Sequence, residues 1–99
     1  KEPHPKVFLI GMGKTAKEYC SVLAQKLRDE NISCDIAYEK NSLKAQMKAA
    51  DKSNAYYTLI LGDEELSTNT VTLKNMENGL QKQIPLVSLA QAIKKGNIV

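Results

Sequence analysis

The sequence predicts a single α/β domain: a five-stranded mixed sheet (β-α-β-α-β, then an antiparallel hairpin and a C-terminal helix) with three helices. Three observations predict it: apolar runs that end at glycine, amphipathic segments between those runs, and an Asn-Gly pair in the last third. The chain has 99 residues, 42% hydrophobic and 25% charged, which suits one globular domain. We expect residues 1–6 to be a linker end, 7–96 the domain and 97–99 a tail.

The first half of the chain alternates strands with helices. Residues 7–10 and 55–61 are continuous apolar runs, as in strands buried on both faces, and 32–38 alternates apolar with polar residues. Apolar residues recur at helical spacing over 16–27 and again over 43–50. Two β-α-β crossovers follow from this order, so the three strands should be parallel.

Capping signals mark the ends of these helices. Thr15 and Glu18 form a capping box, which predicts Thr15 as the first N-cap. Ser42 should cap the second helix, with Leu43 facing the core. Asn31 is an expected stop for the first helix, because asparagine tolerates the left-handed backbone of a C-terminal cap.

The last third predicts an antiparallel extension of the sheet. Residues 63–66 should form a short turn or single helical turn, and 70–74 should form a strand. The Asn78-Gly79 pair predicts a two-residue hairpin turn, with 80–84 as the returning strand. A second capping box and a glycine stop predict a last helix, marked by Ser88, Gln91 and Gly96.

Composition excludes several functional classes. The single histidine is His4, and the two cysteines form no CxxC pair, so we expect no metal site and no catalytic triad. No apolar run reaches the ~20 residues of a membrane helix, and no signal peptide opens the sequence. Cys20 and Cys34 should be reduced core residues of a cytoplasmic protein. The net charge of +3 permits a polyanionic partner without requiring one.

Two glycine motifs suggest nucleotide binding. The Gly-Lys-Thr at 13–15 resembles the end of a P-loop, but Phe8 stands where the loop needs its first glycine. A GxGxxA pattern that begins at Gly11 matches the looser dinucleotide motif, with Glu39 placed as a ribose-binding acid. A dinucleotide-binding half-domain that uses Gly11 and Gly13 is therefore one alternative. The other interpretation is a tight turn from strand to helix.

The most informative charge pattern is a run of lysines in and just before the second helix. Lys40, Lys44, Lys48 and Lys52 recur every four residues, which places them on one helix face. Such a face is either solvated or a positive stripe for phosphates.

Three segments together resemble the C-terminal domain of histidine–tRNA ligases. Residues 41–52 (NSLKAQMKAADK) are similar to the SLKKQLKxADK helix of that family, and 59–66 (LILGDEEL) to its LILGxDEL stretch. Residues 70–81 resemble its VxVKDL…G-Q hairpin. The resemblance covers about 7–93. Ala45 stands where many relatives have a further lysine, so we expect fewer phosphate contacts.

The resemblance implies the anticodon-binding domain of a class II aminoacyl-tRNA ligase. Such a domain binds tRNA, holds no cofactor and carries no catalytic residue. The preceding catalytic domain of the parent, a cytoplasmic homodimer, would join histidine to its tRNA with ATP and Mg. The alternative is a ligase-like protein that regulates metabolism or senses uncharged tRNA.

RNA-binding residues are expected on the second helix and in the segment from Gly62 to Lys74. Lysines of the helix should neutralise phosphates, and polar residues at its start should reach base edges, because sequence-specific RNA recognition targets unstacked loop bases. Glu65 matches the acid of the family's GxxE turn, and Lys74 matches a basic position on the same sheet edge. The full expected set is Glu39, Asn41, Lys44, Gln46, Lys48, Glu65 and Lys74.

Overall fold

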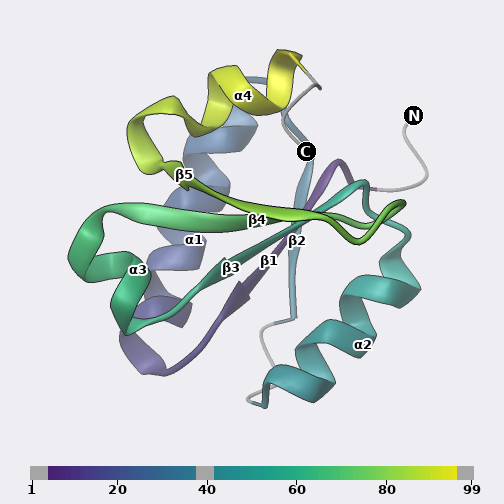
Figure 1. Cartoon of the computed structure of the whole chain (residues 1–99), viewed down its shortest axis with the longest axis horizontal. Coiled ribbons are helices and arrows are strands. Elements are labelled where there is room, and N and C mark those ends of the chain that lie inside the picture. Colours follow the sequence, from purple (N-terminus) through teal and green to yellow (C-terminus); the bar gives the residue numbers. More distant parts are fainter. Residues whose placement is uncertain (1–4, 38–41, 96–99) are drawn as a thin grey trace.

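The computed structural model describes residues 5–37 and 42–95 and confirms the expected fold class, a five-stranded mixed sheet flanked by helices (Figure 1). The strands are β1 (Val7–Gly11), β2 (Cys34–Ile36), β3 (Tyr57–Leu61), β4 (Thr70–Asn75) and β5 (Gln81–Pro85). The helices are α1 (Lys14–Asp29), α2 (Leu43–Ser53), α3 (Asp63–Thr68) and α4 (Leu89–Lys95), with a 3₁₀ turn η1 (Leu86–Ser88) before α4.

The strands lie in the order β2-β1-β3-β4-β5. Strand β1 pairs in parallel with both β2 and β3, as the two crossovers predicted, whereas β4 pairs antiparallel with β3 and with β5. The two parallel pairings of β1 differ in length. β3 accompanies β1 from Val7 to Gly11, but β2 accompanies it only as far as Leu9.

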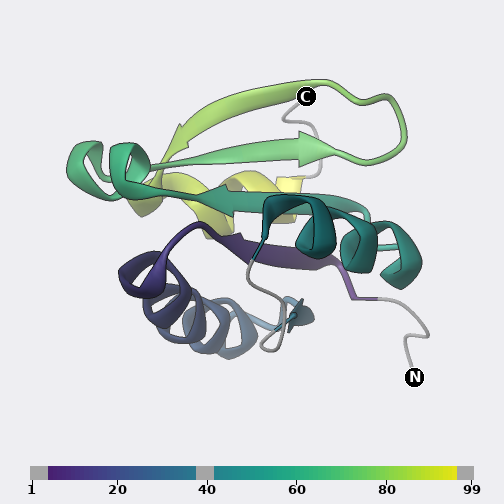
Figure 2. The same cartoon turned by 90° about the horizontal axis from the view of Figure 1, so that it is seen from below.

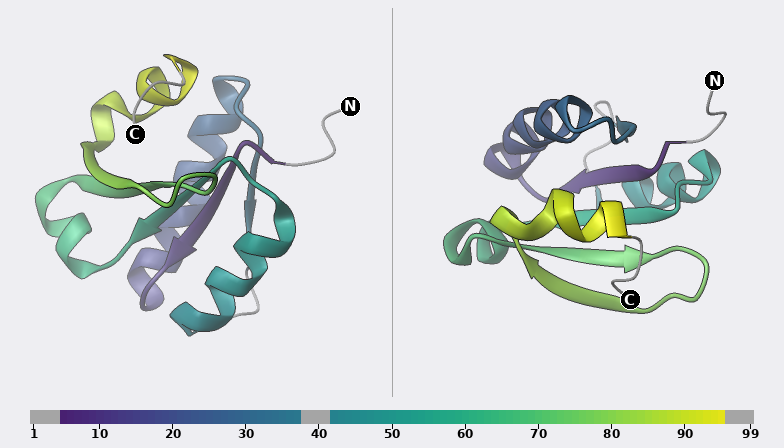
Figure 3. Two further views of the ribbon diagram at one scale, coloured as in Figure 1. Left: turned by 45° about the vertical axis from the view of Figure 1, so that its right-hand side comes forward. Right: turned by 90° about the horizontal axis from the view of Figure 1, so that it is seen from above.

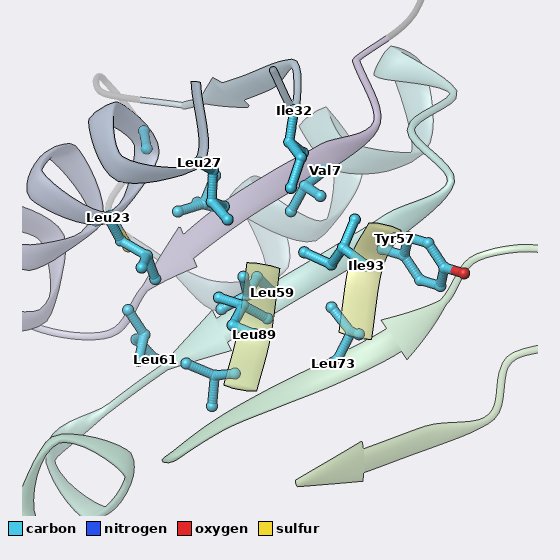
Figure 4. Packing of buried hydrophobic residues seen from close by; sticks show 14 of the residues in the cluster. Val7, Leu23, Leu27, Ile32, Tyr57, Leu59, Leu61, Leu73, Leu89 and Ile93 are labelled. Atoms are coloured by element: carbon cyan, nitrogen blue, oxygen red, sulfur yellow. The ribbon is translucent and has the colours of Figure 1, made fainter. Parts of the chain in front are cut away.

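Helices α1 and α4 cover one face of the sheet, which we call the covered face. Alternate residues of the central strands point into this core, among them Leu9, Leu59 and Leu73, each fully buried. Leu27 of α1 and Ile93 of α4 reach the same core from the helices (Figure 4). The expected apolar stripe of the first helix is thereby confirmed.

Helix α2 packs against the opposite face, over β1 and β3. A smaller core forms there around Phe8, Ile10 and Ala50. Figure 2 shows α2 in front of the sheet with no helix in front of β4 and β5, and Figure 3 (right) shows α4 on the other side. We call this exposed half of the α2 side the open face. Its residues alternate with the covered-face residues Val71, Leu73 and Ile84.

Two of the expected ends of the first two helices are confirmed, and one is wrong. Asn31 has a left-handed φ of 66° after α1, and the Ser42 hydroxyl accepts a hydrogen bond from the Ala45 amide at 3.1 Å. Asn54 ends α2 with φ 58°. The prediction of Thr15 as N-cap is wrong, because Gly13 takes that position with φ 96° and turns the chain straight from strand to helix.

Leu43 does not face the core as expected. Its side chain is 42% exposed at the first residue of α2, and the buried residues of this helix are Gln46 and Ala50. Strand β2 is also shorter than the predicted 32–38, and the end of that range lies outside the described residues.

The hairpin turn is longer than the two residues predicted. Only Gly79 of the Asn-Gly pair has positive φ, at 77°, whereas the expected turn type needs positive φ at both residues. The chain instead pairs the Asn75 amide with the Leu80 carbonyl at 2.8 Å. The Asn75 side-chain oxygen accepts hydrogen bonds from the Glu77 and Asn78 amides and organises the wider loop.

Two expectations at short helices are also revised. Residues 63–68 form the six-residue helix α3 rather than one turn, so the sheet has four accompanying α-helices among the described residues instead of three. The chain reaches α4 through the 3₁₀ turn that follows Pro85, rather than directly from a capping box at Ser88. Gly96, the expected stop, lies outside the described residues.

Candidate nucleic-acid interface

Helix α2 presents a stripe of lysines to solvent. Lys44, Lys48 and Lys52 are exposed and four residues apart, while Gln46 and Ala50 face the sheet from the opposite side of the helix. Lys40 lies outside the described residues. The three lysines are about one helical turn apart, so their charges form a row along the helix. Phosphates are likewise spaced in a row along a nucleic-acid backbone.

Glu65 lies where β3 ends and α3 begins. One carboxylate oxygen accepts a hydrogen bond from the Gly62 amide at 2.8 Å, which caps α3 from within. The other oxygen accepts the Thr72 hydroxyl at 3.3 Å. These two bonds hold the half-buried carboxylate at the edge of the open face, and each oxygen keeps capacity for a further donor.

Lys74 belongs to the same face. It lies two residues beyond Thr72 on β4, so both side chains point to the α2 side, opposite to Leu73. Its pairing partner on β3 is Thr58 and its partner on β5 is Gln81. The structure therefore places Lys74 on the same face as Thr72 and its hydrogen-bond acceptor Glu65, with the lysine stripe of α2 on the same side of the sheet.

The structure contradicts the base-reading role expected for Gln46. Its side chain is fully buried, and its amide bonds both backbone groups of Gly11: the oxygen accepts the Gly11 N–H at 3.1 Å and the nitrogen donates to the Gly11 carbonyl at 2.9 Å. Sequence spacing placed Gln46 near the start of the helix but did not reveal which side of the helix it occupies.

Glu39 and Asn41, the other two expected base-reading residues, lie outside the described residues. Their roles stay predictions.

Three polar residues of the open face were not singled out from the sequence. Thr72 supports Glu65, while Gln81 and Gln83 are exposed on β5 and pair with Lys74 and Thr72. The alternation of polar and apolar residues in TVTLK and QKQI could have indicated them. Hydroxyl and amide side chains can both donate to and accept from base edges.

The glycine motif at the end of β1 has a structural explanation. A Cβ on Gly11 would lie 2.7 Å from the backbone Cα and N of Lys17, so only glycine lets α1 pack this close. Gly13 supplies the positive φ of the turn, and Phe8, where a P-loop would need glycine, is buried in β1. The Gln46 side chain also takes the Gly11 N–H that a phosphate would need. The tight turn accounts for the motif without a cofactor.

Neither cysteine is activated for chemistry. Burial raises the pKa of Cys20 from 9.0 to about 12, although Lys17 opposes the shift, and burial raises that of Cys34 to about 11. Both are free thiols, Cys20 fully buried and Cys34 partly so. A thiol that stays protonated is a poor nucleophile, so these side chains serve packing.

Within residues 5–37 and 42–95, no three His, Cys, Asp or Glu side chains cluster in a way that could hold a metal ion. The helices in those same ranges are all too short or too polar to span a bilayer.

Comparison with known proteins agrees with this geometry. A family model described as "Anticodon binding domain" matches residues 6–96. The histidine–tRNA ligase of Nocardia farcinica is 45% identical over 80 residues, which are 81% of this chain and 19% of that protein. The histidine–tRNA ligase of Clostridium botulinum (strain Loch Maree) is 42% identical over 94 residues, which are 95% of this chain and 23% of that protein.

A solved structure extends the comparison to three dimensions. The apo histidyl-tRNA synthetase of S. aureus matches with a TM-score of 0.86 and 35% identity, over 93% of this chain and 27% of that one. The chain thus spans about a fifth to a quarter of the length of these relatives. Because the family model covers nearly the whole chain, and because these relatives are histidine–tRNA ligases, the resemblance expected from the sequence is confirmed: the chain belongs to the anticodon-binding domain family.

Proposed function

We propose that this chain is the anticodon-binding domain of a histidine–tRNA ligase and that it binds the anticodon stem-loop of the cognate tRNA along its open face. The observation that carries the proposal is the gathering of Glu65, Thr72 and Lys74 on the α2 side of the sheet, where none of the described helices covers β4 and β5. Membership of the anticodon-binding family supports the same face as an RNA surface.

An anticodon loop offers phosphates and unstacked bases, and different residues of the surface would bind each. Lys44 and Lys48 neutralise phosphates, a contribution that is independent of base sequence and sensitive to salt. Glu65 accepts hydrogen bonds from a base edge and so discriminates between bases. Lys74 extends the positive charge onto the sheet. Glu39 and Asn41 retain the base-reading role predicted from their sequence positions just before the second helix.

Thr72, Gln81 and Gln83 add polar groups to this surface. They carry no charge, so they contribute to recognition of bases or sugars more than to general attraction of RNA. Because they stand on paired strands, their spacing is set by the sheet and changes little on binding.

The rest of the parent would supply the reaction. We infer a catalytic domain that uses ATP and Mg to join histidine to tRNA, in a cytoplasmic homodimer. We assign no step of that reaction to this chain, since its family match is to the anticodon-binding part of such a protein. The domain would raise the affinity and selectivity of the parent for its tRNA through a second point of contact.

A direct titration tests the proposal. A fluorescently labelled stem-loop with the histidine anticodon is titrated with the 99-residue chain at low salt, beside the same stem-loop with its anticodon bases replaced. Tighter binding of the cognate loop, weakening as salt rises, is the expected result. Equal binding of both loops would refute anticodon recognition, and no binding would refute the RNA surface. NAD, titrated in parallel, should not bind.

A further inference from the structure

The end of β1 has backbone groups that no strand pairs among residues 5–37 and 42–95. The Met12 amide donates to the Leu61 carbonyl at 2.8 Å, so the N–H and C=O of the preceding Gly11 point the other way, toward β2. Strand β2 has already ended: its last pairing partner on β1 is Leu9. Left alone in this buried position, the two Gly11 groups would each cost the free energy of an unsatisfied hydrogen bond.

The Gln46 amide fills the place of the missing strand. It accepts from the Gly11 N–H at 3.1 Å and donates to the Gly11 carbonyl at 2.9 Å, as a peptide group of a neighbouring strand would. A side chain from α2 thus extends the sheet hydrogen bonding by one step beyond β2. Both groups are buried, so water cannot replace the contact without opening the helix–sheet interface.

The remaining packing of helix α2 on the sheet is apolar, in the small core around Phe8, Ile10 and Ala50. The fully buried residues of the helix are Gln46 and Ala50, and alanine provides no directional contact. Apolar packing alone allows a helix to slide or rotate on a sheet, whereas two hydrogen bonds to one glycine define a single register. Gln46 lies between Lys44 and Lys48 in the sequence. Gly11, to which it is bonded, pairs with Leu61 where β1 and β3 end together, directly before Gly62.

We propose that Gln46 is a positioning residue for RNA recognition: its amide locks α2 to Gly11 and thereby sets the lysine stripe at a fixed place relative to Glu65. The inference rests on the proposed function and deepens it. Gln46 does not touch RNA. It acts through Lys44 and Lys48. By preventing α2 from shifting on the sheet, it keeps the distance between these lysines and Glu65 constant.

The first test compares two variants that each remove a buried polar group. Gln46→Met keeps side-chain length and loses both hydrogen bonds. Thr58→Val is the control, because Thr58 is also fully buried and hydrogen-bonded, to Met76 at 2.8 Å, but belongs to β3. In Gln46→Met, hydrogen exchange of the Gly11 amide and of the first turns of α2 should accelerate about tenfold or more, with the rest of the sheet unchanged. Unchanged protection of Gly11 would overturn the lock.

The second test is a double-mutant cycle on RNA affinity. Gln46→Met should weaken binding of the cognate stem-loop roughly 3- to 10-fold, in the range of couplings measured between linked residues. In a chain that already carries Lys44→Ala and Lys48→Ala, the same substitution should have almost no effect. Thr58→Val should give equal, small effects in both backgrounds. A Gln46→Met effect that persists without the lysines would show general loss of structure and overturn the positioning role.

The two proposals fail in distinguishable ways. If the unaltered chain does not bind the stem-loop, the proposed function falls and the role of Gln46 in RNA recognition falls with it. If the unaltered chain binds and discriminates, but Gln46→Met exchanges faster and binds as before, only the positioning role is overturned. Accelerated exchange at Gly11 together with coupling to the lysines supports both.

Discussion

The two faces of the sheet are formed by the same strands, but one face packs in the core and the other presents polar side chains. On the covered face, Leu59, Val71 and Leu73 pack under α1 and α4 with no exposure. On the open face, Thr72 and Lys74 alternate along β4 with Val71 and Leu73, and they reach solvent or a neighbouring polar group. Because successive side chains of a strand point to opposite faces, one strand can contribute apolar residues to the core and polar residues to recognition.

This comparison predicts that substitutions one residue apart in β4 separate stability from binding. Leu73→Ala should lower the free energy of unfolding by about 2–5 kcal/mol, because it leaves a cavity in the core. Lys74→Ala should change it by less than about 0.5 kcal/mol, yet weaken stem-loop binding. Urea unfolding and anisotropy titrations measure the two quantities. Similar unfolding losses for both variants would contradict the division between faces.

The next largest effect should concern base discrimination. Glu65→Gln retains an oxygen for the Gly62 amide and so keeps the cap of α3, but removes the negative charge. We expect the preference for the cognate anticodon to fall roughly tenfold, since one well-placed polar contact to a base edge discriminates by about 1–3 kcal/mol. Glu65→Ala, which also removes the cap, should in addition cost about 1 kcal/mol of stability.

Preserved discrimination in Glu65→Gln, with unchanged affinity for both loops, would remove Glu65 from the recognition surface and leave it as a cap only. Competition between the cognate stem-loop and the loop with replaced anticodon bases measures this preference directly.

A smaller, sequence-independent effect is expected from the lysine stripe. Lys44→Ala combined with Lys48→Ala should lower the slope of log affinity against log salt by about 1.4, since each contact to single-stranded phosphate contributes about 0.7. All RNAs should be affected alike. Lys26→Ala is the matched control, because Lys26 is exposed on α1 beside the covered face. An equal loss from Lys26→Ala would mean that the attraction to RNA is spread over the whole surface.

The smallest effect concerns pH and the covered face. Cys20 lies in the core with its pKa raised to about 12, whereas the unfolded thiol titrates near 9.0. The folded state holds the proton that the unfolded state releases, so this contribution to stability is complete below pH 9 and is lost progressively as the pH rises toward 12. By pH 10 the loss should reach about 1.4 kcal/mol.

The difference between the intact chain and Cys20→Ala isolates this term, because the other groups titrate alike in both proteins. Urea unfolding at pH 8 and pH 10 should show the free energy of the intact chain falling more than that of Cys20→Ala. Equal losses would mean that the thiol is not held protonated by burial.

Most of the fold was predictable because its signals are local. The apolar stripe of α1, the cap at Ser42 and the stop at Asn31 depend on residues within a few positions of one another. The N-cap of α1 was not predictable from Thr15 alone, since Gly13, two residues earlier, takes that position through its backbone conformation.

The site was predictable only in part, because some of it depends on contacts distant in sequence. Lys44 and Lys48 were identified correctly as exposed, since a four-residue repeat defines a helix face. The burial of Gln46 depends on β2 ending two residues before the last pairing of β1, which no local pattern encodes. The wider hairpin loop likewise depends on hydrogen bonds of the Asn75 side chain.

RNA should bind to the open face and to the lysine stripe of α2, and not to the covered face. Amide chemical-shift mapping of the isotopically labelled chain with the histidine anticodon stem-loop tests it most directly. The account predicts shifts at Lys44, Lys48, Glu65, Thr72 and Lys74, with α1 and α4 unaffected. Shifts concentrated on α1 and α4, with the open face unchanged, would contradict it.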